Sequence, residues 1–173
     1  MTTPGIPERQ RPLFQLYRDE PERAWVTDVA QASWTLDDPL HTAVTMGPDA
    51  NGPYPLALHS AVGGESDGPV PGDLLCASLA SCLDSTLRVI AEHLKAEITA
   101  LSVSVTAEVD VRGTLLVRKE VPVGFQRMTA HVELALADGT PPRIRDHLIR
   151  AAERSCVILQ TLRKAVPVHL QIT

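Results

Sequence analysis

The stretch Pro71–Lys95, PGDLLCASLASCLDSTLRVIAEHLK, decides the fold. Proline at a first helical position and Asp73 in the first turn both favour the start of a helix there. From Leu74 to Ala91 the only charged residues are Asp84 and Arg88, which are four apart and can pair along one helix face. A helix that is apolar around most of its circumference is normally buried on several sides. We therefore expect a long buried central helix.

The pattern changes after this helix. Apolar and polar residues alternate from Leu101 to Arg112 and again from Ala130 to Leu136, which predicts two antiparallel strands. Pro141-Pro142 then precedes a second predicted helix with an apolar stripe formed by Ile144, Leu148, Ala152, Cys156 and Leu159. The alternating run from Val166 to Ile172 predicts a final strand.

The N-terminal part has a different composition. Residues 1–71 hold 4 basic and 10 acidic residues and 10 of the 14 prolines, too little material for a dense core of their own. They still contain three strand-like runs, Trp25–Trp34, His41–Met46 and Leu56–Val62. We interpret this part as an arm of strands and loops that pairs with the rest of the chain or with a partner subunit. The opening residues, to about Pro12, are expected to be loose.

The element order is N-terminal antiparallel strands, long central helix, two-strand meander, second helix and final strand, which makes an α+β fold. We expect residues 1–20 to be an N-terminal extension and residues 21–173 to form a single domain. The 173 residues carry a net charge of −5 and only 3% aromatics, which argues against nucleic-acid binding. No apolar run has the length of a membrane helix, and the first residues do not resemble a signal peptide. We expect a cytoplasmic protein with reduced thiols and no membrane partner.

Most familiar catalytic motifs are absent. The sequence has no HExxH, GxSxG, Walker or CxxC pattern. The loop 63–68, GGESDG, lacks the lysine of a phosphate-binding loop and is interpreted as a flexible turn. The six histidines show no spacing typical of metal ligands, so neither a metal nor another cofactor is predicted.

The three cysteines are the remaining candidates for chemistry. Cys76 and Cys82 are six apart on one predicted helix and project to different faces, so they cannot form a disulfide with each other. Cys82 and Cys156 each lie in the middle of an apolar helix face. Buried cysteine is often a packing residue, and from the residues alone a packing and a functional role for this pair are about equally favoured. Cys76 is assigned to packing.

Several of these residues resemble a known family. Gly63-Gly64 is followed by the stretch Pro71–Cys82, which fits P-x-x-L-L-x-A-x-x-x-x-C, and Cys156–Leu162 matches a C-P-V-x-x-T-L segment. Together they resemble the OsmC/Ohr family over about residues 56–173. The resemblance implies an OsmC-like fold and an intertwined homodimer in which two chains exchange their N-terminal strands around two central helices.

The resemblance also implies a function, namely thiol peroxidase activity in oxidative-stress defence. Cys82 would attack an organic hydroperoxide or hydrogen peroxide as a thiolate and become a sulfenic acid. Cys156 would condense with it to a disulfide, which an external dithiol reduces. A sulfenic acid beside a second thiol is protected from overoxidation.

The sequence departs from the family at two positions. The best-characterised peroxidases of the family have a glutamate ten residues before the first cysteine, where this chain has Gly72, and Asp73 lies one residue too late. No arginine aligns with the one that members use to hold the thiolate. Without a nearby cation, burial would raise the pKa of Cys82. The alternative is therefore a non-catalytic OsmC-fold dimer that binds a small hydrophobic ligand. A thiol enzyme that acts on acyl groups ranks last, because no histidine has a recognisable place beside either cysteine.

Overall fold

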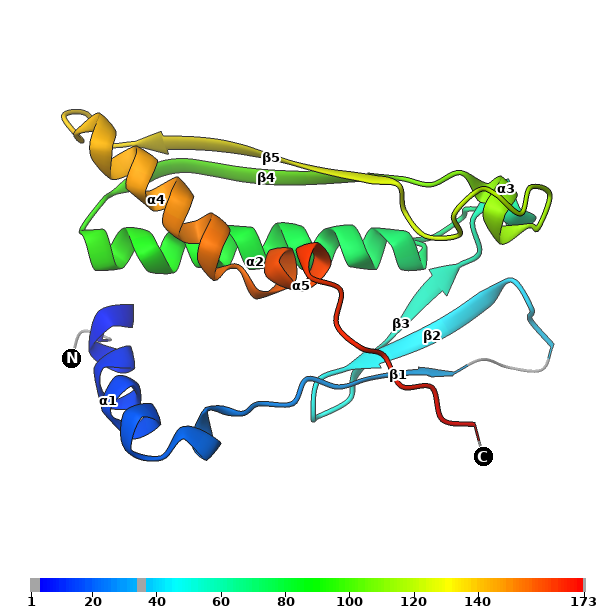
Figure 1. The fold of residues 1–173 in the computed structure, drawn as a ribbon, viewed down its shortest axis with the longest axis horizontal. Helices are drawn as coiled ribbons and strands as arrows, with labels where there is room; N and C mark the ends of the chain where they lie inside the picture. Colours follow the sequence, from blue (N-terminus) through cyan, green and yellow to red (C-terminus); the bar gives the residue numbers. More distant parts are fainter. Residues whose placement is uncertain (1–3, 34–36, 173) are drawn as a thin grey trace. The chain divides into compact units, whose positions relative to one another are not determined.

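The structure is a computed structural model that describes residues 4–33 and 37–172 (Figure 1). The secondary structure elements, in chain order, are α1 Ile6–Asp19, η1 Pro21–Ala24, β1 Ala30–Ser33, β2 His41–Met46, β3 Asn51–Ala57, η2 Ser60–Val62, α2 Pro71–Leu94, β4 Ile98–Glu108, α3 Val111–Thr114, β5 Arg127–Leu136, α4 Pro142–Ser155 and α5 Val157–Arg163. The α+β class is confirmed, with antiparallel strands on both sides of the long helix in the sequence.

The chain divides into two compact units, and each is described by itself. The first contains the described residues of Met1–Leu13, Ala77–Val105 and Ala130–Thr173. We call it the helical unit. The second contains the described residues of Phe14–Cys76 and Thr106–Thr129, and we call it the arm unit. The prediction that residues 21–173 form a single domain stays a prediction.

Strands β4 and β5 form a two-stranded sheet, as the alternating pattern predicts. The prediction that the first strand continues to Arg112 is wrong, because β4 ends at Glu108 and the Asp110 side chain caps the short helix α3. Backbone N–H groups of Ala137 and Gln126 donate to the carbonyl oxygens of Glu97 and Glu108, each at 2.9 Å. Rising numbers on one strand therefore meet falling numbers on the other, which makes the pair antiparallel.

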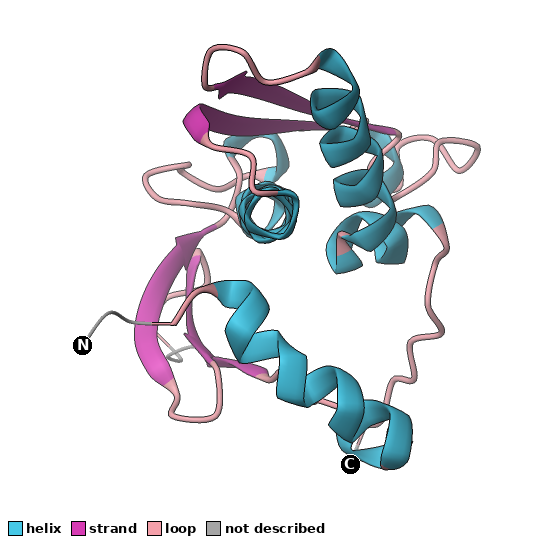
Figure 2. Cartoon of the chain, turned by 90° about the vertical axis from the view of Figure 1, so that its left-hand side faces the viewer, coloured by secondary structure: helices cyan, strands magenta, loops and turns pink. Residues whose placement is uncertain are grey.

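The core of the helical unit lies between its two main helices and this sheet. Leu87 and Ala91 of α2 and Leu148 and Ala152 of α4 are at most 2% exposed and form one cluster. Partly buried residues of the strands, Leu101, Val103, Val132, Leu134 and Leu136, pack against the cluster. Figure 2 shows α2 end-on, with α4 and the two strands beside it. The apolar faces of all four elements therefore face the same interior.

Helix α2 is buried along one stripe rather than on several sides. Its buried residues are Leu79, Leu83, Leu87 and Ala91, spaced by four, while Ser81 and Ser85 lie on an exposed face. By length and composition alone α2 could cross a membrane, which is weak evidence because core helices of soluble proteins pass the same test. Since its buried stripe lies against the sheet and α4 of the helical unit, α2 is a core helix of this unit.

The arm unit contains a three-stranded antiparallel sheet in the order β1-β2-β3. β2 has the predicted bounds. β1 is shorter than the run Trp25–Trp34, and Trp34 lies outside the described residues. β3 begins earlier and ends at Ala57, where the predicted run Leu56–Val62 continues instead into the short helix η2. The buried residues of the sheet are Val44, Leu56 and Ala57.

The expectation of a loose N-terminus to about Pro12 is wrong, because α1 covers most of this segment. The backbone N–H of Ile6 donates to Glu92 Oε2 at 2.9 Å. His93 Nε2 and Gln10 Oε1 lie 2.6 Å apart. Both contacts join α1 to the last turn of α2. A helix that the composition does not predict is therefore held by residues more than eighty positions away.

The final strand predicted over Val166–Ile172 is not formed in this chain. The described residues 165–172 have no regular secondary structure, and Val168, Leu170 and Ile172 are each more than 80% exposed. A strand needs neighbouring backbone donors and acceptors. Within the described residues no strand pairs with this segment, so its alternating pattern has nothing to pair against.

Candidate functional site

The structure brings the two predicted site residues together. The Sγ atoms of Cys82 and Cys156 are 3.1 Å apart in the helical unit, although the residues are 74 positions apart in the chain. Both are free thiols. A disulfide has an S–S length of about 2.0 Å, so a small movement of the side chains suffices to join them. Their catalytic roles stay predictions.

Cys156 lies at a break between two helices, and the prediction that it sits in the middle of one helix is wrong. Its backbone, with φ −70° and ψ 110°, ends α4 and begins α5. The Cys156 Sγ accepts a hydrogen bond from the backbone N–H of Leu159 at 3.5 Å, as an N-cap side chain does. The break turns the first amides of α5 toward the pair of thiols.

The surroundings of Cys82 favour its thiolate. Burial by itself would raise the pKa of Cys82, but hydrogen bonds outweigh it and lower the pKa. The donors are the backbone N–H groups of Ile158 and Val157, the Cys156 thiol and the Thr86 hydroxyl. All four are neutral groups. The expectation that the pKa of Cys82 is raised in the absence of a cation is wrong, because these neutral backbone and side-chain dipoles stabilise the thiolate.

Cys156 has the opposite bias. It is fully buried, and burial, together with the neighbouring Cys82, raises its pKa, although backbone N–H groups of Leu159 and Ile158 act the other way. As the pH rises, Cys82 therefore loses its proton before Cys156 does, and the Cys156 thiol donates to the Cys82 sulfur. Two thiols in contact thus have different protonation preferences.

Cys76 belongs to the arm unit. Within the described part of the chain, no hydrogen-bond donor is among the groups that shift the pKa of Cys76. Burial and the nearby Asp73 carboxylate raise the pKa of Cys76. Asp73 also accepts a hydrogen bond from the backbone N–H of Val70 at 2.9 Å, as the third residue of a helix does in a capping box. The assignment of Cys76 to packing stays a prediction.

Gly72, at the position where the resemblance implies a glutamate, lies against an aromatic ring. A Cβ placed on Gly72 would come within 3.0 Å of Phe125 Cζ. A longer side chain at this position would require the ring to move. The first turn of α2 is thus shaped for packing against Phe125.

The feature that sequence reasoning missed is the break at Cys156. The run Arg154–Leu159 contains neither glycine nor proline, the residues that usually mark the end of a helix. The apolar stripe also continues from α4 through Cys156 into α5, so the helical periodicity does not reveal the break. Within the part of the chain that the structure describes, no three His, Cys, Asp or Glu residues are placed to hold a metal ion.

Solved structures of similar fold come from several bacteria. An organic hydroperoxide resistance protein from Legionella pneumophila has 21% identity and a TM-score of 0.59, with 82% of this chain and 92% of that chain covered. One from Elizabethkingia anophelis has 17% identity and a TM-score of 0.63, with 83% and 92% covered. An OsmC-like protein of unknown function from Vibrio cholerae has 10% identity and a TM-score of 0.64, with 79% and 94% covered. At these identities the likeness is one of fold.

No curated protein matches the chain at a significant level. A family model does: the model of the OsmC-like proteins matches residues 63–171. This range contains both cysteine segments and lies within the range of the resemblance read from the sequence. Because the match covers more than half of the sequence, the chain belongs to the OsmC-like protein family.

Proposed function

We propose that the protein is a thiol peroxidase that reduces organic hydroperoxides or hydrogen peroxide. The Cys82 thiolate attacks the terminal oxygen of the peroxide, the O–O bond breaks, and a proton completes the alcohol or water that leaves. Cys82 is then a sulfenic acid. The Cys156 sulfur attacks the Cys82 sulfur, a disulfide forms and water leaves. An external dithiol returns both cysteines to the thiol state by exchange and is itself oxidised to a disulfide.

One observation carries this proposal. The two sulfurs are in contact at 3.1 Å, and the partner with the lowered pKa, Cys82, is also the partly exposed one. A thiolate is the reactive form of cysteine, and a peroxide has to reach it. The buried Cys156 keeps its proton until the sulfenic acid forms. Each cysteine therefore has the surroundings that its proposed role requires.

Two of the proteins of similar fold described above are organic hydroperoxide resistance proteins. That description applies to those proteins, and it supports a role of this chain in oxidative-stress defence. The partly exposed position of Cys82 also agrees with a substrate that arrives from solution. We propose that the protein works in the cytoplasm, where small dithiols and dithiol proteins stay reduced.

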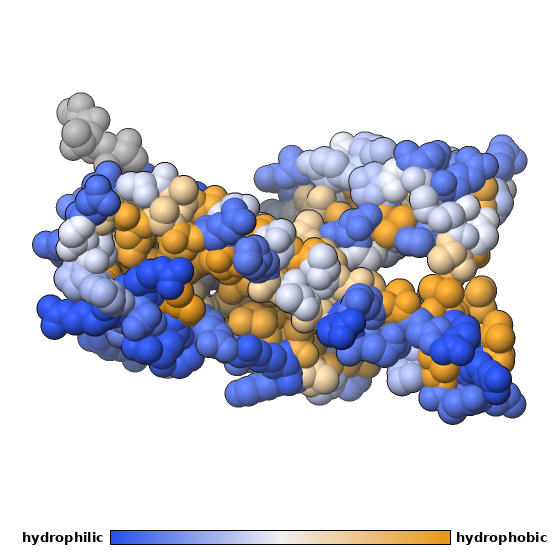
Figure 3. All heavy atoms as spheres, turned by 90° about the horizontal axis from the view of Figure 1, so that it is seen from above, coloured by the Kyte–Doolittle hydropathy of each residue, from blue (hydrophilic) through white to orange (hydrophobic). Residues whose placement is uncertain are grey.

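We further propose that the working form is a homodimer. Trp25 is 87% exposed in the arm, and the alternating segment near the C-terminus, Val166–Ile172, leaves its apolar side chains in solvent. Figure 3 shows apolar residues, in orange, at several places on the surface. Exposed apolar surface of this kind marks an interaction site, and a second copy offers strands for both segments. Sedimentation equilibrium is expected to give twice the mass of 18.7 kDa.

Stopped-flow mixing of the reduced protein with an organic hydroperoxide tests the reaction. The wild type should consume one peroxide per chain, and mass spectrometry should find a disulfide between Cys82 and Cys156. Cys82→Ser should consume none above the rate without protein. Cys76→Ser is the matched control on the same helix and should behave as the wild type. If Cys82→Ser consumes peroxide at the wild-type rate, the proposal is wrong.

The second candidate is a non-catalytic dimer that binds a small hydrophobic ligand. It is favoured by Gly72, where the family's glutamate is replaced and Phe125 fills the space. A measured pKa of Cys82 at or above that of a free thiol would support this candidate. Ultraviolet absorbance of the thiolate, followed against pH in Cys76→Ser, gives that value.

A further inference from the structure

His41 lies between two carboxylates in the arm unit. Its Nδ1 is 2.8 Å from Asp38 Oδ2, and its Nε2 is 3.0 Å from Asp67 Oδ1. The first carboxylate lies three positions before His41, whereas the second lies 26 positions after it. This cluster is remote in sequence from Cys82 and Cys156, and the peroxidase proposal makes no use of it.

Asp67 belongs to the loop, residues 58–70, that joins β3 to α2. The loop is folded back on itself: the Gly64 and Ser66 N–H groups donate to the carbonyl oxygens of His59 and Leu58. A Cβ on Gly64 would come within 1.9 Å of the Leu58 carbonyl oxygen, so only glycine permits this approach. The loop therefore has a definite shape rather than that of the flexible turn expected from its composition.

The two sides of His41 are not equivalent. Asp38 Oδ1 also accepts hydrogen bonds from the backbone N–H groups of Leu40 and His41, both at 3.1 Å. These bonds hold Asp38 in a local turn whatever the state of the imidazole. The contact with Asp67 instead joins the start of β2 to the middle of the 58–70 loop, whose first residue, Leu58, is held separately by its N–H bond to the Leu40 carbonyl oxygen at 2.8 Å. The contact between His41 and Asp67 is therefore the one that depends on the protonation state of the imidazole.

An imidazolium has two N–H donors and can serve both carboxylates, but a neutral imidazole has only one. The neutral ring keeps its donor on the locally held Asp38, so the lone pair of Nε2 faces the Asp67 carboxylate. We propose that His41 is a proton-operated latch: its protonated form fastens the 58–70 loop to β2, and loss of the proton releases the loop at Asp67.

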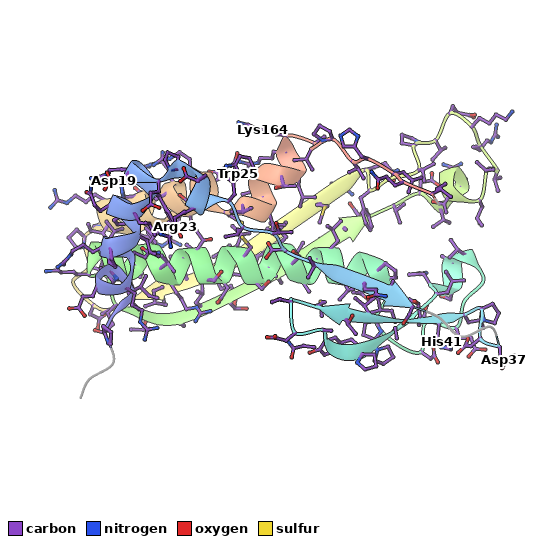
Figure 4. All side chains as sticks on the ribbon, turned by 90° about the horizontal axis from the view of Figure 1, so that it is seen from below. Asp19, Arg23, Trp25, Asp37, His41 and Lys164 are labelled. Atoms are coloured by element: carbon purple, nitrogen blue, oxygen red, sulfur yellow. The ribbon has the colours of Figure 1, made fainter. Side chains whose placement is uncertain are left out.

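The charges around the latch set its pH range. Hydrogen bonds to Asp67 and Asp38 raise the pKa of His41 above its ordinary value of 6.5. The hydrogen bond from His41 lowers the pKa of Asp67, and although burial opposes it, the net shift of Asp38 is also downward. The other charged groups close in sequence, Asp37 and Glu65, are acidic; Figure 4 shows Asp37 and His41 at the same end of the sheet. The latch is closed between the carboxylate and imidazole pKa values and opens as the pH rises through the latter.

Hydrogen–deuterium exchange of the full chain tests the latch. Exchange of peptides within residues 58–70 is measured from pH 5.5 to pH 8.5 and corrected for the intrinsic pH dependence of amide exchange. In the wild type, protection of the loop should fall by at least about threefold over this range. In His41→Gln the loop should exchange at the released rate at all pH values. His131→Gln, a change of an exposed histidine on β5, should keep the wild-type profile.

A second variant and a second measurement keep the test decisive if His41→Gln folds poorly. Asp67→Asn leaves the loop neutral at position 67, so the pH dependence should shrink and the pKa of His41, followed by NMR, should fall toward 6.5. Loop protection that does not change with pH in the wild type would overturn the proposal. A wild-type pH profile in Asp67→Asn would also overturn it.

Discussion

Cys76 and Cys82 lie less than two turns apart on one helix, yet the surroundings of Cys76 raise its pKa and those of Cys82 lower its pKa. Burial raises the pKa of both thiols. Beside Cys76 the carboxylate of Asp73 adds to this effect, whereas beside Cys82 four neutral donors reverse it. The comparison shows that the helix itself does not activate a thiol. The difference comes from what other segments of the chain bring to each position.

The largest expected effect is the loss of turnover in Cys156→Ser. The serine hydroxyl cannot form a disulfide, so Cys82 should remain a sulfenic acid after it has reacted with one peroxide. In excess peroxide this sulfenic acid should be oxidised further to the sulfinic acid. Steady-state peroxide reduction with a dithiol should fall by about 100-fold or more, as it does when one member of a cooperating set is lost. Trapping with dimedone should label Cys82 in this variant. A variant that still turns over at the wild-type rate would show that Cys156 is not the resolving residue.

The comparison of the two thiols is tested directly by alkylation. Iodoacetamide reacts with the thiolate, so Cys82 should be modified about tenfold faster than Cys76 at pH 7. The rate at Cys82 should also reach its plateau at lower pH. Peptide mass spectrometry of the reduced protein reads both sites in one sample. Equal rates at all pH values would remove the distinction on which the peroxidase proposal depends.

A smaller effect is expected from Thr86, whose hydroxyl donates to Cys82. Thr86→Val keeps the shape of the side chain and removes the donor, so the pKa of Cys82 should rise and its peroxide rate at pH 7 should fall by about two- to tenfold. Thr86→Ser keeps the hydroxyl and is the matched control. The readout is the pH profile of the reaction, which a purely structural defect would not displace along the pH axis.

The smallest effect is expected at Asp73. Burial is the main cause of the raised pKa of Cys76, and Asp73→Asn removes the charge that adds to it but keeps an oxygen that can accept from the Val70 N–H. The alkylation rate of Cys76 should rise by about twofold at low salt, and added salt should reduce the difference. The rate of Cys82 should stay unchanged, which makes it the internal reference.

Much of the fold follows from sequence patterns that reflect local physics. The bounds of β2, the antiparallel pair β4 and β5, and the central helix were all expected from alternation or helical periodicity. The contact of Cys82 with Cys156 was implied by the family resemblance. These features depend on apolar patterns that point to the same interior, so the sequence is a good guide to them.

The features that escaped prediction depend on partners distant in the sequence. α1 contains Pro12 and has no buried residue, but Glu92 and His93 hold its first turns. No glycine or proline marks the break at Cys156 in the sequence. The backbone N–H groups that the break leaves free cannot be predicted from the side chains. The segment Val166–Ile172 has the pattern of a strand but lacks a neighbour among the described residues. Periodicity predicts the face that a residue presents and not the group that it meets.

The interruption between α4 and α5 has a consequence for how this thiol responds to its medium. Amide, hydroxyl and thiol donors carry no net charge, so dissolved ions screen them far less than they screen an ion pair at the surface. Two of the four donors are main-chain groups, which among single substitutions only a change to proline removes. The reactivity of Cys82 should therefore depend little on ionic strength. It should also tolerate most side-chain substitutions around it, whereas a site that depends on one cation would lose activity with that residue.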